Sequence, residues 1–165
     1  MEILIYPHKD LKKKALPITN IDGSLQALID EMLKTMYEAQ GVGLAANQIG
    51  MLKKLIVMDL DQREGTHNPI VVINPRIEAA EGEIVEAESC LSVPDYSADI
   101  KRAKKVFLKG FDRHGKEISM ECQGLLAKCV QHEVDHLNGI CFVDRLGPVK
   151  KRLFKRKWSK SKGKP

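Results

Sequence analysis

Apolar residues recur at helical spacing shortly after the start of the chain. The positions are Leu25, Leu28, Ile29, Met32, Leu33, Met36 and Tyr37. Side chains three and four residues apart share one face of a helix. Asp22-Gly23-Ser24 precedes this run and offers side chains that can cap a helix N-terminus. The pattern therefore predicts an amphipathic helix from this segment to about Gln40, packed on a core through its apolar face.

A different pattern follows, in which short runs are rich in apolar and β-branched residues. Three runs predict strands: Leu55 to Leu60, Pro69 to Asn74 and Glu83 to Ala87. Lys104 to Phe111 and Lys116 to Glu121 are separated by the turn-prone residues 112–115 and predict a β-hairpin. Residues 41–48, which read GVGLAANQ, predict a loop of small residues.

The last regular pattern predicts a second helix from about Gly124, ended by Asn138-Gly139. The order is thus a helix, several short strands, a helix and a basic tail. This order favours an α+β fold with helices packed on antiparallel strands. The chain contains no internal repeat and no clear linker before about residue 146. We therefore predict one catalytic domain over residues 1–149 and a basic C-terminal extension, helix or tail, over residues 150–165.

Composition narrows the class of protein. The 165 residues are 43% hydrophobic and 30% charged, as in an ordinary soluble globular protein. No apolar run is long enough for a membrane span, and the first residues do not resemble a signal peptide. The four cysteines form no C-x-x-C pair, which indicates a reduced, cytoplasmic setting.

Candidate chemistry is concentrated on the second predicted helix, at His132-Glu133-Val134-Asp135-His136. Histidines four residues apart share one helical face, so both imidazoles can point at one metal ion. Glu133 lies about 100° round the helix from His132 and is better placed to contact a metal-bound water. The alternative is a helical histidine pair with a surface or core role. The helical context favours a metallohydrolase.

A catalytic site with three protein ligands needs one more donor. Downstream, the chain offers Cys141 and Asp144. Cys141 lies in an apolar stretch, where buried packing is the more usual role of a thiol. Cys90 is the better candidate, because it follows an acidic segment and is bracketed by turn-prone residues. A buried structural thiol is the alternative for Cys90 as well.

The glycine-containing loop has two interpretations. Gly41-Val42-Gly43 resembles part of a phosphate-binding fingerprint, but a third spaced glycine is missing and a helix precedes it, so nucleotide binding is not expected. Small residues there would instead let another backbone approach closely. Gln48 ends the loop with an amide donor, which is either functional or simply solvated.

Three separated segments together resemble bacterial peptide deformylases. They are residues 41–48, residues 88–92 (ESCLS) and residues 131–139 (QHEVDHLNG). Their order and spacing match the family over nearly the whole chain. The resemblance implies an α+β fold of antiparallel strands around a central metal-binding helix. It also implies removal of the formyl group from the N-terminal formylmethionine of newly synthesised polypeptides.

The resemblance implies a role for each matching residue. The metal ligands would be Cys90, His132 and His136. Glu133 would act as general base and then as general acid, and the Gln48 side chain and the Leu91 backbone N–H would form the oxyanion hole. The cofactor would be one divalent metal ion, Fe(II) in the cell, with zinc, nickel or cobalt as substitutes.

Substrate binding is implied in the same way, for Gly43, Leu44, Glu86, Glu88, Leu125 and Lys128. The backbone of Gly43 and Leu44 would pair with the peptide as an added strand. The pocket beyond it would receive the methionine side chain of the substrate.

Four residues depart from the family pattern. Ser89 stands where glycine is common, Ser97 where an arginine that contributes to peptide binding is often found, and Glu86 and Lys128 where apolar residues are usual. A cation near a metal calls for a counter-charge, so we expect Glu86 to pair with Lys128 on the pocket wall. Alternatively, Lys128 extends to solvent. These departures affect substrate preference and turnover more than the metal site.

Charge is unevenly distributed along the chain. The net charge is +5, yet residues 1–149 carry 18 Lys/Arg against 22 Asp/Glu, while residues 150–165 carry nine Lys/Arg and no acid. A solvated, frayed terminus is one interpretation. Cations interleaved with Leu153, Phe154 and Trp158 also suit contact with RNA. Some bacterial deformylases use a C-terminal helix near the ribosomal exit tunnel, so the resemblance favours ribosome docking.

Three functions follow from these observations. The leading one is a peptide deformylase that acts as a monomer on nascent formylmethionyl polypeptides, without a membrane partner. The second is a deformylase-like hydrolase with an altered N-acyl substrate. The third is a ribosome- or RNA-binding protein with a structural metal site. A zinc endopeptidase is less favoured, because no suitable third ligand is evident downstream of His136.

Overall fold

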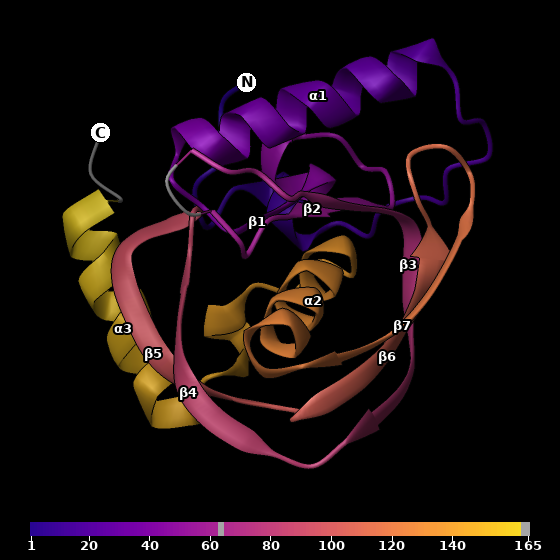
Figure 1. Cartoon of the computed structure of the whole chain (residues 1–165). Helices are drawn as coiled ribbons and strands as arrows, with labels where there is room; N and C mark the ends of the chain where they lie inside the picture. Colours follow the sequence, from indigo (N-terminus) through magenta and orange to yellow (C-terminus); the bar gives the residue numbers. More distant parts are fainter. Residues whose placement is uncertain (63–64, 163–165) are drawn as a thin grey trace.

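The computed structural model describes residues 1–62 and 65–162, with side chains as far as residue 160. Its strands are β1 (Gly43–Ala45), β2 (Leu55–Met58), β3 (Ile70–Glu81), β4 (Ile84–Cys90), β5 (Val93–Arg102), β6 (Lys105–Phe111) and β7 (Glu117–Gln123). One antiparallel sheet has the order β1-β2-β3-β6-β7, and β4 pairs with β5 in a second. Both sheets surround helix α2 (Gly124–Leu137), which lies at the centre (Figure 1). This confirms the predicted fold class.

Helix α1 (Gly23–Glu38) forms where the apolar pattern predicts it. The Asp22 side chain accepts a hydrogen bond from the Leu25 backbone N–H at 2.9 Å, which caps the helix start. The apolar face then packs against residues of β1, β2 and β3 in one buried cluster. The helix lies across the top of the larger sheet (Figure 1).

Helix α2 ends as predicted, at the Asn138-Gly139 pair. Gly139 has a φ of 78°, and its N–H donates to the His136 carbonyl at 3.0 Å. The Ile140 N–H donates to the Asp135 carbonyl at 2.9 Å, which completes a Schellman motif. The two accepting carbonyls belong to Asp135 and His136, within the H-E-x-x-H segment of residues 132–136. This cap therefore holds the last turn of the helix in place.

Two predictions of local structure were wrong. The predicted loop over residues 41–48 contains strand β1 and the 3-10 helix η2 (Ala46–Ile49), because its backbone pairs with β2 at Gly43 and Met58. Strand β5 was not predicted, since charged residues interrupt its apolar positions. In addition, β3 continues past Asn74 to Glu81, with register shifts on either side of Arg76. In all three segments, backbone pairing with a strand elsewhere in the chain determines the structure that forms.

The C-terminal segment forms helix α3 (Pro148–Lys162), which follows the 3-10 helix η3 (Phe142–Arg145). Phe154 and Trp158 are buried, and the Trp158 indole N–H donates to the Tyr6 carbonyl at 2.8 Å. The interpretation as a frayed terminus is therefore wrong for the described part of this helix. A domain boundary at residue 150 stays a prediction. Among the described residues, no helix has the length and apolar character needed to cross a membrane.

Candidate metal centre and active site

The two histidines of the H-E-x-x-H sequence lie side by side on α2. Their ring centroids are 5.0 Å apart, and the ligand atoms of His132, Glu133 and His136 all lie within 4.8 Å of one another. His136 is fully buried, and burial lowers its pKa well below the usual range, which keeps the imidazole neutral. A neutral imidazole can donate a lone pair to a metal ion.

Cys90 joins this pair from the end of β4. Its Sγ lies 3.3 Å from His136 Nε2. The β4–β5 connection is tight, because Cys90 pairs with Val93 after a register shift, and this turn directs the thiol inward. Gln48 approaches from η2, with its Nε2 3.6 Å from Cys90 Sγ and 3.1 Å from Ser92 Oγ. The structure thus brings His136 close to both Cys90 and His132, and it places the amide of Gln48 beside Cys90. The ligand set Cys90, His132 and His136 stays a prediction.

A buried network of charges supports His132. Its Nδ1 lies 2.9 Å from Glu88 Oε1, and Arg102 bonds both Glu88 oxygens, at 2.7 and 2.9 Å. Arg102 also donates to Asp135 at 2.6 Å, and Arg145 donates to Asp135 through two further bonds. Burial raises the pKa of Glu88, but the bonds from Arg102 and His132 outweigh it and hold that pKa at about 2. A charged Glu88 orients the imidazole through Nδ1 and leaves Nε2 for a metal.

The carboxyl group of Glu133 differs from that of Glu88 in its pKa and in its hydrogen bonds. Burial raises its pKa to about 7, and its Oε1 has no hydrogen-bond partner among the described residues. Gly43 makes room for the other oxygen, since a Cβ at that position would lie 2.5 Å from Glu133 Oε2. A carboxylate with a pKa near neutrality and an unpartnered oxygen is suited to accept and return a proton.

The donor set fits a divalent transition metal. One thiolate and two imidazoles are borderline-soft ligands that suit iron, cobalt, nickel and zinc. Three such ligands leave one coordination position open, as in catalytic sites. Glu133 Oε1 has no hydrogen-bond partner among the described residues, so it can bond to a molecule bound beside these ligands.

Comparison with known proteins decides the family. A model of the polypeptide deformylase family matches residues 1–152. The chain belongs to this family. Membership identifies the reaction as metal-dependent hydrolysis that removes the N-formyl group of newly made polypeptides.

Individual deformylases match over almost the full length. The peptide deformylase of Thermodesulfovibrio yellowstonii is 51% identical over 162 residues, which cover 98% of each chain. That of Syntrophobacter fumaroxidans is 50% identical, over 97% of this chain and 94% of its own length. The solved deformylase of Legionella pneumophila is 45% identical with a TM-score of 0.90, covering 99% of this chain and 98% of that one. The deformylase of Synechococcus elongatus in complex with actinonin has a TM-score of 0.90 at 39% identity, covering 99% and 88%.

The deformylase site opens into a cavity of about 660 Å³. Of the predicted substrate-binding residues, its walls include Gly43, Glu88, Leu125 and Lys128. Leu44 is fully buried in the core behind β1, so it can offer the substrate only its backbone. Glu86 lies outside the lining, and the carboxylate of Glu88 is occupied by Arg102 and His132.

The predicted ion pair on the cavity wall is confirmed. Lys128 Nζ lies 3.4 Å from Glu86 Oε2 and donates to the Ala87 carbonyl at 2.9 Å. The Lys128 side chain is 17% exposed, so the alternative in which it extends to solvent is wrong. The pocket of this deformylase therefore has a cation on its wall.

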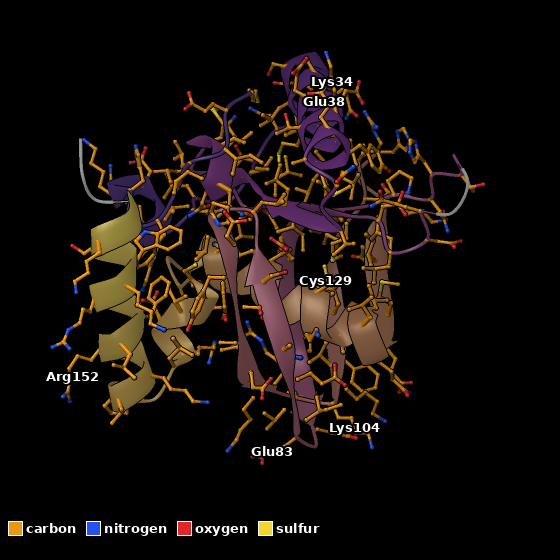
Figure 2. All side chains as sticks on the ribbon, turned by 90° about the vertical axis from the view of Figure 1, so that its left-hand side faces the viewer. Lys34, Glu38, Glu83, Lys104, Cys129 and Arg152 are labelled. Carbon is orange, nitrogen blue, oxygen red and sulfur yellow. The ribbon has the colours of Figure 1, made fainter. Side chains whose placement is uncertain are left out.

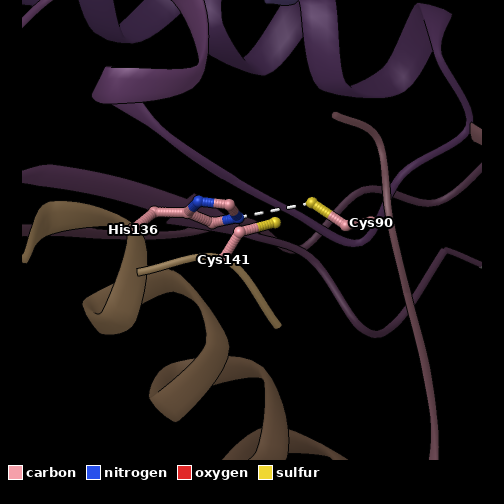
Figure 3. Close-up of side chains that lie close together, drawn as sticks. All are labelled: Cys90, His136 and Cys141. Atoms are coloured by element: carbon pink, nitrogen blue, oxygen red, sulfur yellow. Dashed lines mark hydrogen bonds between the residues drawn. The ribbon is translucent and has the colours of Figure 1, made fainter. Parts of the chain in front are cut away.

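Two parts of the site were missed or given too little weight. Arg102 and Asp135 carry the buried charge network, but their sequence context is typical of exposed charges. Cys141 is a possible ligand for which the sequence favours a packing role, yet its Sγ, Cys90 Sγ and a ring nitrogen of His136 form a second group of ligand atoms, all within 4.8 Å of one another (Figure 3). The H-E-x-x-H sequence alone predicts neither the buried charge network nor the position of Cys141.

Proposed function

We propose that Cys90, His132 and His136 bind the catalytic metal ion of this deformylase and that Glu133 carries the proton. The observation that supports this most directly is the convergence of α2 with the end of β4, where Cys90 Sγ lies 3.3 Å from His136 Nε2. The preferred substrate is a nascent polypeptide that begins with formylmethionine, and the protein acts in the cytoplasm as a monomer. By resemblance to the family, the metal in the cell is Fe(II), with zinc, nickel or cobalt as substitutes.

The chemistry of the site follows from its side chains. A bound divalent ion would polarise the formyl oxygen and make water acidic enough to ionise near neutral pH. Glu133 accepts the proton of the attacking water and delivers it to the amine that leaves. Its raised pKa, about 7, suits both steps, because the carboxyl can hold and release a proton near neutrality.

The developing negative charge on the formyl oxygen needs donors that are already in position. Gln48 Oε1 accepts from the Ala45 N–H at 2.9 Å, which turns the Gln48 amide N–H₂ toward Cys90. Leu91, in the turn after Cys90, lines the same cavity and would supply a backbone N–H. Each such donor is typically worth about 3 kcal/mol of transition-state stabilisation.

The peptide part of the substrate has a natural place beside β1. Among the described residues this strand pairs with β2 alone and forms the edge of the five-stranded sheet. Gly43, at its start, lines the cavity. An extended peptide can therefore add to β1 through backbone hydrogen bonds at Gly43 and Leu44. In this arrangement the first substrate residue would lie next to the proposed metal ligands.

The experiment is hydrolysis of formyl-Met-Ala-Ser by enzyme loaded with Fe(II), nickel or cobalt, followed by formate release. We expect release by the wild type, loss of almost all activity in Glu133→Ala with metal content unchanged, and binding of actinonin, which the Synechococcus elongatus deformylase binds. Glu83→Ala, which removes an exposed acid at the far end of β4, serves as the matched control (Figure 2). A metal-loaded wild type without activity would favour a structural metal site. Activity that persists in Glu133→Ala would exclude the proton-carrier role.

A second candidate, an altered N-acyl preference, is favoured by the Glu86–Lys128 pair. The cationic Nζ beside the pocket adds a polar group that an apolar methionine side chain cannot satisfy. We propose that this pair shifts preference toward polar first residues relative to other deformylases. The metal chemistry is the same in both cases.

Helix α3 has a basic surface that suits binding of a further partner. We propose that its outer face contacts ribosomal RNA, because Lys150, Arg152, Lys155, Arg156, Lys157 and Lys160 are exposed while Phe154 and Trp158 anchor the inner face. Arg152 projects away from the body of the molecule (Figure 2). Such a surface would bind RNA phosphates with strong salt dependence.

Deleting α3 would expose buried aromatic residues, so charge reversal is the cleaner test. We expect Arg152→Glu with Arg156→Glu to weaken ribosome binding and reduce its salt dependence, with hydrolysis of formyl-Met-Ala-Ser nearly unchanged. Lys9→Glu with Lys12→Glu reverses two exposed cations elsewhere and should have a smaller effect. Equal loss in both double variants would argue against a specific contact through α3.

A further inference from the structure

Cys141 holds a second thiol at the proposed metal centre. It directly precedes η3, is only 2% exposed, and its Sγ lies within 4.8 Å of both Cys90 Sγ and a ring nitrogen of His136. Figure 3 shows the two cysteine side chains approaching each other beside the edge of the His136 ring. Both cysteines are free thiols.

Metal binding alone does not explain this second thiol. Three protein ligands are sufficient for a catalytic site, and a fourth would fill the position that such a site keeps open. The two cysteines also differ in access, because Cys90 lines the cavity and Cys141 does not. A small oxidant entering the cavity would meet Cys90 first, with Cys141 directly behind it.

The remaining cysteines are not placed in this way. Cys129 lines the cavity, but its Sγ contacts the Val42 carbonyl, at 3.9 Å, and it belongs to neither group of clustered ligand atoms among the described residues. Cys122 is buried on β7, in the core between the sheet and α2. Only Cys141 is thus positioned to react with Cys90 among the described residues.

We propose that Cys90 and Cys141 form a reversible disulfide that removes the thiolate ligand and releases the metal. The inference rests on the proposed role of Cys90 as a ligand. With hydrogen peroxide as oxidant, the Cys90 sulfur attacks one oxygen, the O–O bond breaks, and a sulfenic acid and one water form. The Cys141 thiol then attacks the Cys90 sulfur, the S–S bond forms, and a second water leaves. Two thiols are oxidised and one peroxide is reduced.

The consequence is a switch between two forms of the same site. A disulfide sulfur lacks the thiolate lone pair that binds the metal, so only His132 and His136 remain as ligands. A neighbouring resolving thiol also protects Cys90, because a sulfenic acid that is captured as a disulfide does not proceed to the irreversible sulfinic acid. Reduction by a dithiol regenerates both thiols and the metal site.

The test uses the full chain loaded with zinc, since zinc has no redox chemistry of its own. The enzyme is treated with limited hydrogen peroxide. Free thiols, zinc release and intact mass are measured, and cross-linked peptides are mapped. We expect loss of two of the four thiols, a mass lower by two hydrogens, a Cys90–Cys141 cross-link and release of zinc. Dithiothreitol with added zinc should restore the starting state. A wild type that gains oxygen atoms without a cross-link would overturn the proposal.

Two variants separate this inference from the proposed function. Cys141→Ala should bind zinc and deformylate in the reduced state, but peroxide should then oxidise Cys90 to a form that dithiothreitol cannot restore. Cys122→Ala, the matched control, should behave as the wild type. Recovery of Cys141→Ala to the wild-type extent would overturn the switch, whereas failure of both reduced variants and the reduced wild type to deformylate would instead count against the proposed function.

Discussion

Glu88 Oε1 lies 2.9 Å from His132 Nδ1, in a buried contact between β4 and α2. Arg102 bonds both oxygens of the same carboxylate. The carboxylate therefore fixes the direction of the imidazole and favours the state in which Nδ1 carries the proton. We therefore propose that Glu88 positions His132, whereas the resemblance implies a substrate-binding role for Glu88.

Glu88→Gln should weaken zinc binding without unfolding the protein. The amide can still accept the Nδ1–H bond, but it lacks the charge that orients His132 and balances Arg102. We expect the dissociation constant for zinc to rise about 10–100-fold, measured by competition with a chromophoric chelator, with unchanged circular dichroism. Glu78→Gln removes an exposed carboxylate bonded to Arg76 and should not change the affinity. Equal zinc affinity in wild type and Glu88→Gln would show that Glu88 supports only the fold.

Gly43→Ala should impair catalysis by crowding Glu133. The added Cβ would lie 2.5 Å from Glu133 Oε2 and 2.9 Å from Cys129 Sγ, so the carboxylate has to move. A displacement on the order of 1 Å at a reacting group can cost about 100-fold in rate. We expect a fall of that size in kcat with zinc content unchanged. Gly23→Ala, where an added Cβ meets nothing within 4 Å, is the control. A normal kcat in Gly43→Ala would mean that Glu133 tolerates the shift.

Zinc affinity should rise steeply with pH. In the metal-free protein, the neighbouring Cys141 thiol and burial raise the pKa of Cys90 well above its usual range, and burial raises the pKa of Glu133 to about 7. Metal binding requires the Cys90 thiolate and favours the Glu133 carboxylate, so protons compete with the ion at low pH and are released as it binds. Apparent affinity should therefore increase from about pH 6 to about pH 8.

Calorimetry in buffers of different ionisation enthalpy measures the protons released on zinc binding. Cys90→Ser should release fewer protons and bind zinc more weakly. His136 should add little to the release, since burial already lowers its pKa well below the usual range. An affinity that is constant with pH would contradict the assignment of Cys90 as a ligand.

The start of α1 and the end of α2 could be predicted because their signals are local. Asp22 caps α1 through the Leu25 N–H, three residues away, and Gly139 ends α2 through carbonyls of the preceding turn. Strand β5 could not be predicted in this way. Its backbone is satisfied by pairing with β4, and its alternating charged residues resemble a loop when read without that partner.

In the site, too, local relationships could be predicted from spacing along the chain and contacts between distant residues could not. Spacing on one helix predicts that His132 and His136 share a face, but the contact of Cys90 with His136 joins residues 46 positions apart. The residues that flank Cys90 make it the better candidate for a third ligand, and the resemblance to the family implies that it shares a metal ion with His136. Arg102 and Asp135 were missed because charged residues are usually exposed, and their mutual burial arises only when β5 packs on α2.

Trp158→Ala should destabilise the whole fold, because α3 is part of it. Trp158 is 8% exposed, lies 5.4 Å from Phe154 between ring centroids, and bonds the Tyr6 carbonyl. Removing a buried indole typically costs about 3–5 kcal/mol. Urea unfolding should show a loss of this size, whereas the exposed Lys157→Ala should change stability little. A loss below about 1 kcal/mol would indicate that α3 is only loosely attached.

Lys128→Leu should make the pocket more selective for methionine. The wild-type Nζ, held 3.4 Å from Glu86 Oε2, presents a charge that an apolar side chain must desolvate. A polar side chain of similar length can instead bond to it. The measure is the ratio of kcat/KM for formyl-Met-Ala-Ser to that for formyl-Gln-Ala-Ser. We expect Lys128→Leu to raise this ratio about 10-fold, since such pocket contacts discriminate by roughly 1–3 kcal/mol.

Two further variants identify the origin of the effect. Glu86→Gln breaks the ion pair but keeps the cation, so the freed Nζ should favour the polar substrate more strongly and lower the ratio. Lys104→Leu removes an exposed cation at the end of the molecule where Figure 2 labels it beside Glu83, and it should leave the ratio unchanged. An unaltered ratio in Lys128→Leu would mean that the first substrate side chain does not reach Nζ. The Glu86–Lys128 pair would then stabilise the pocket wall without selecting the substrate.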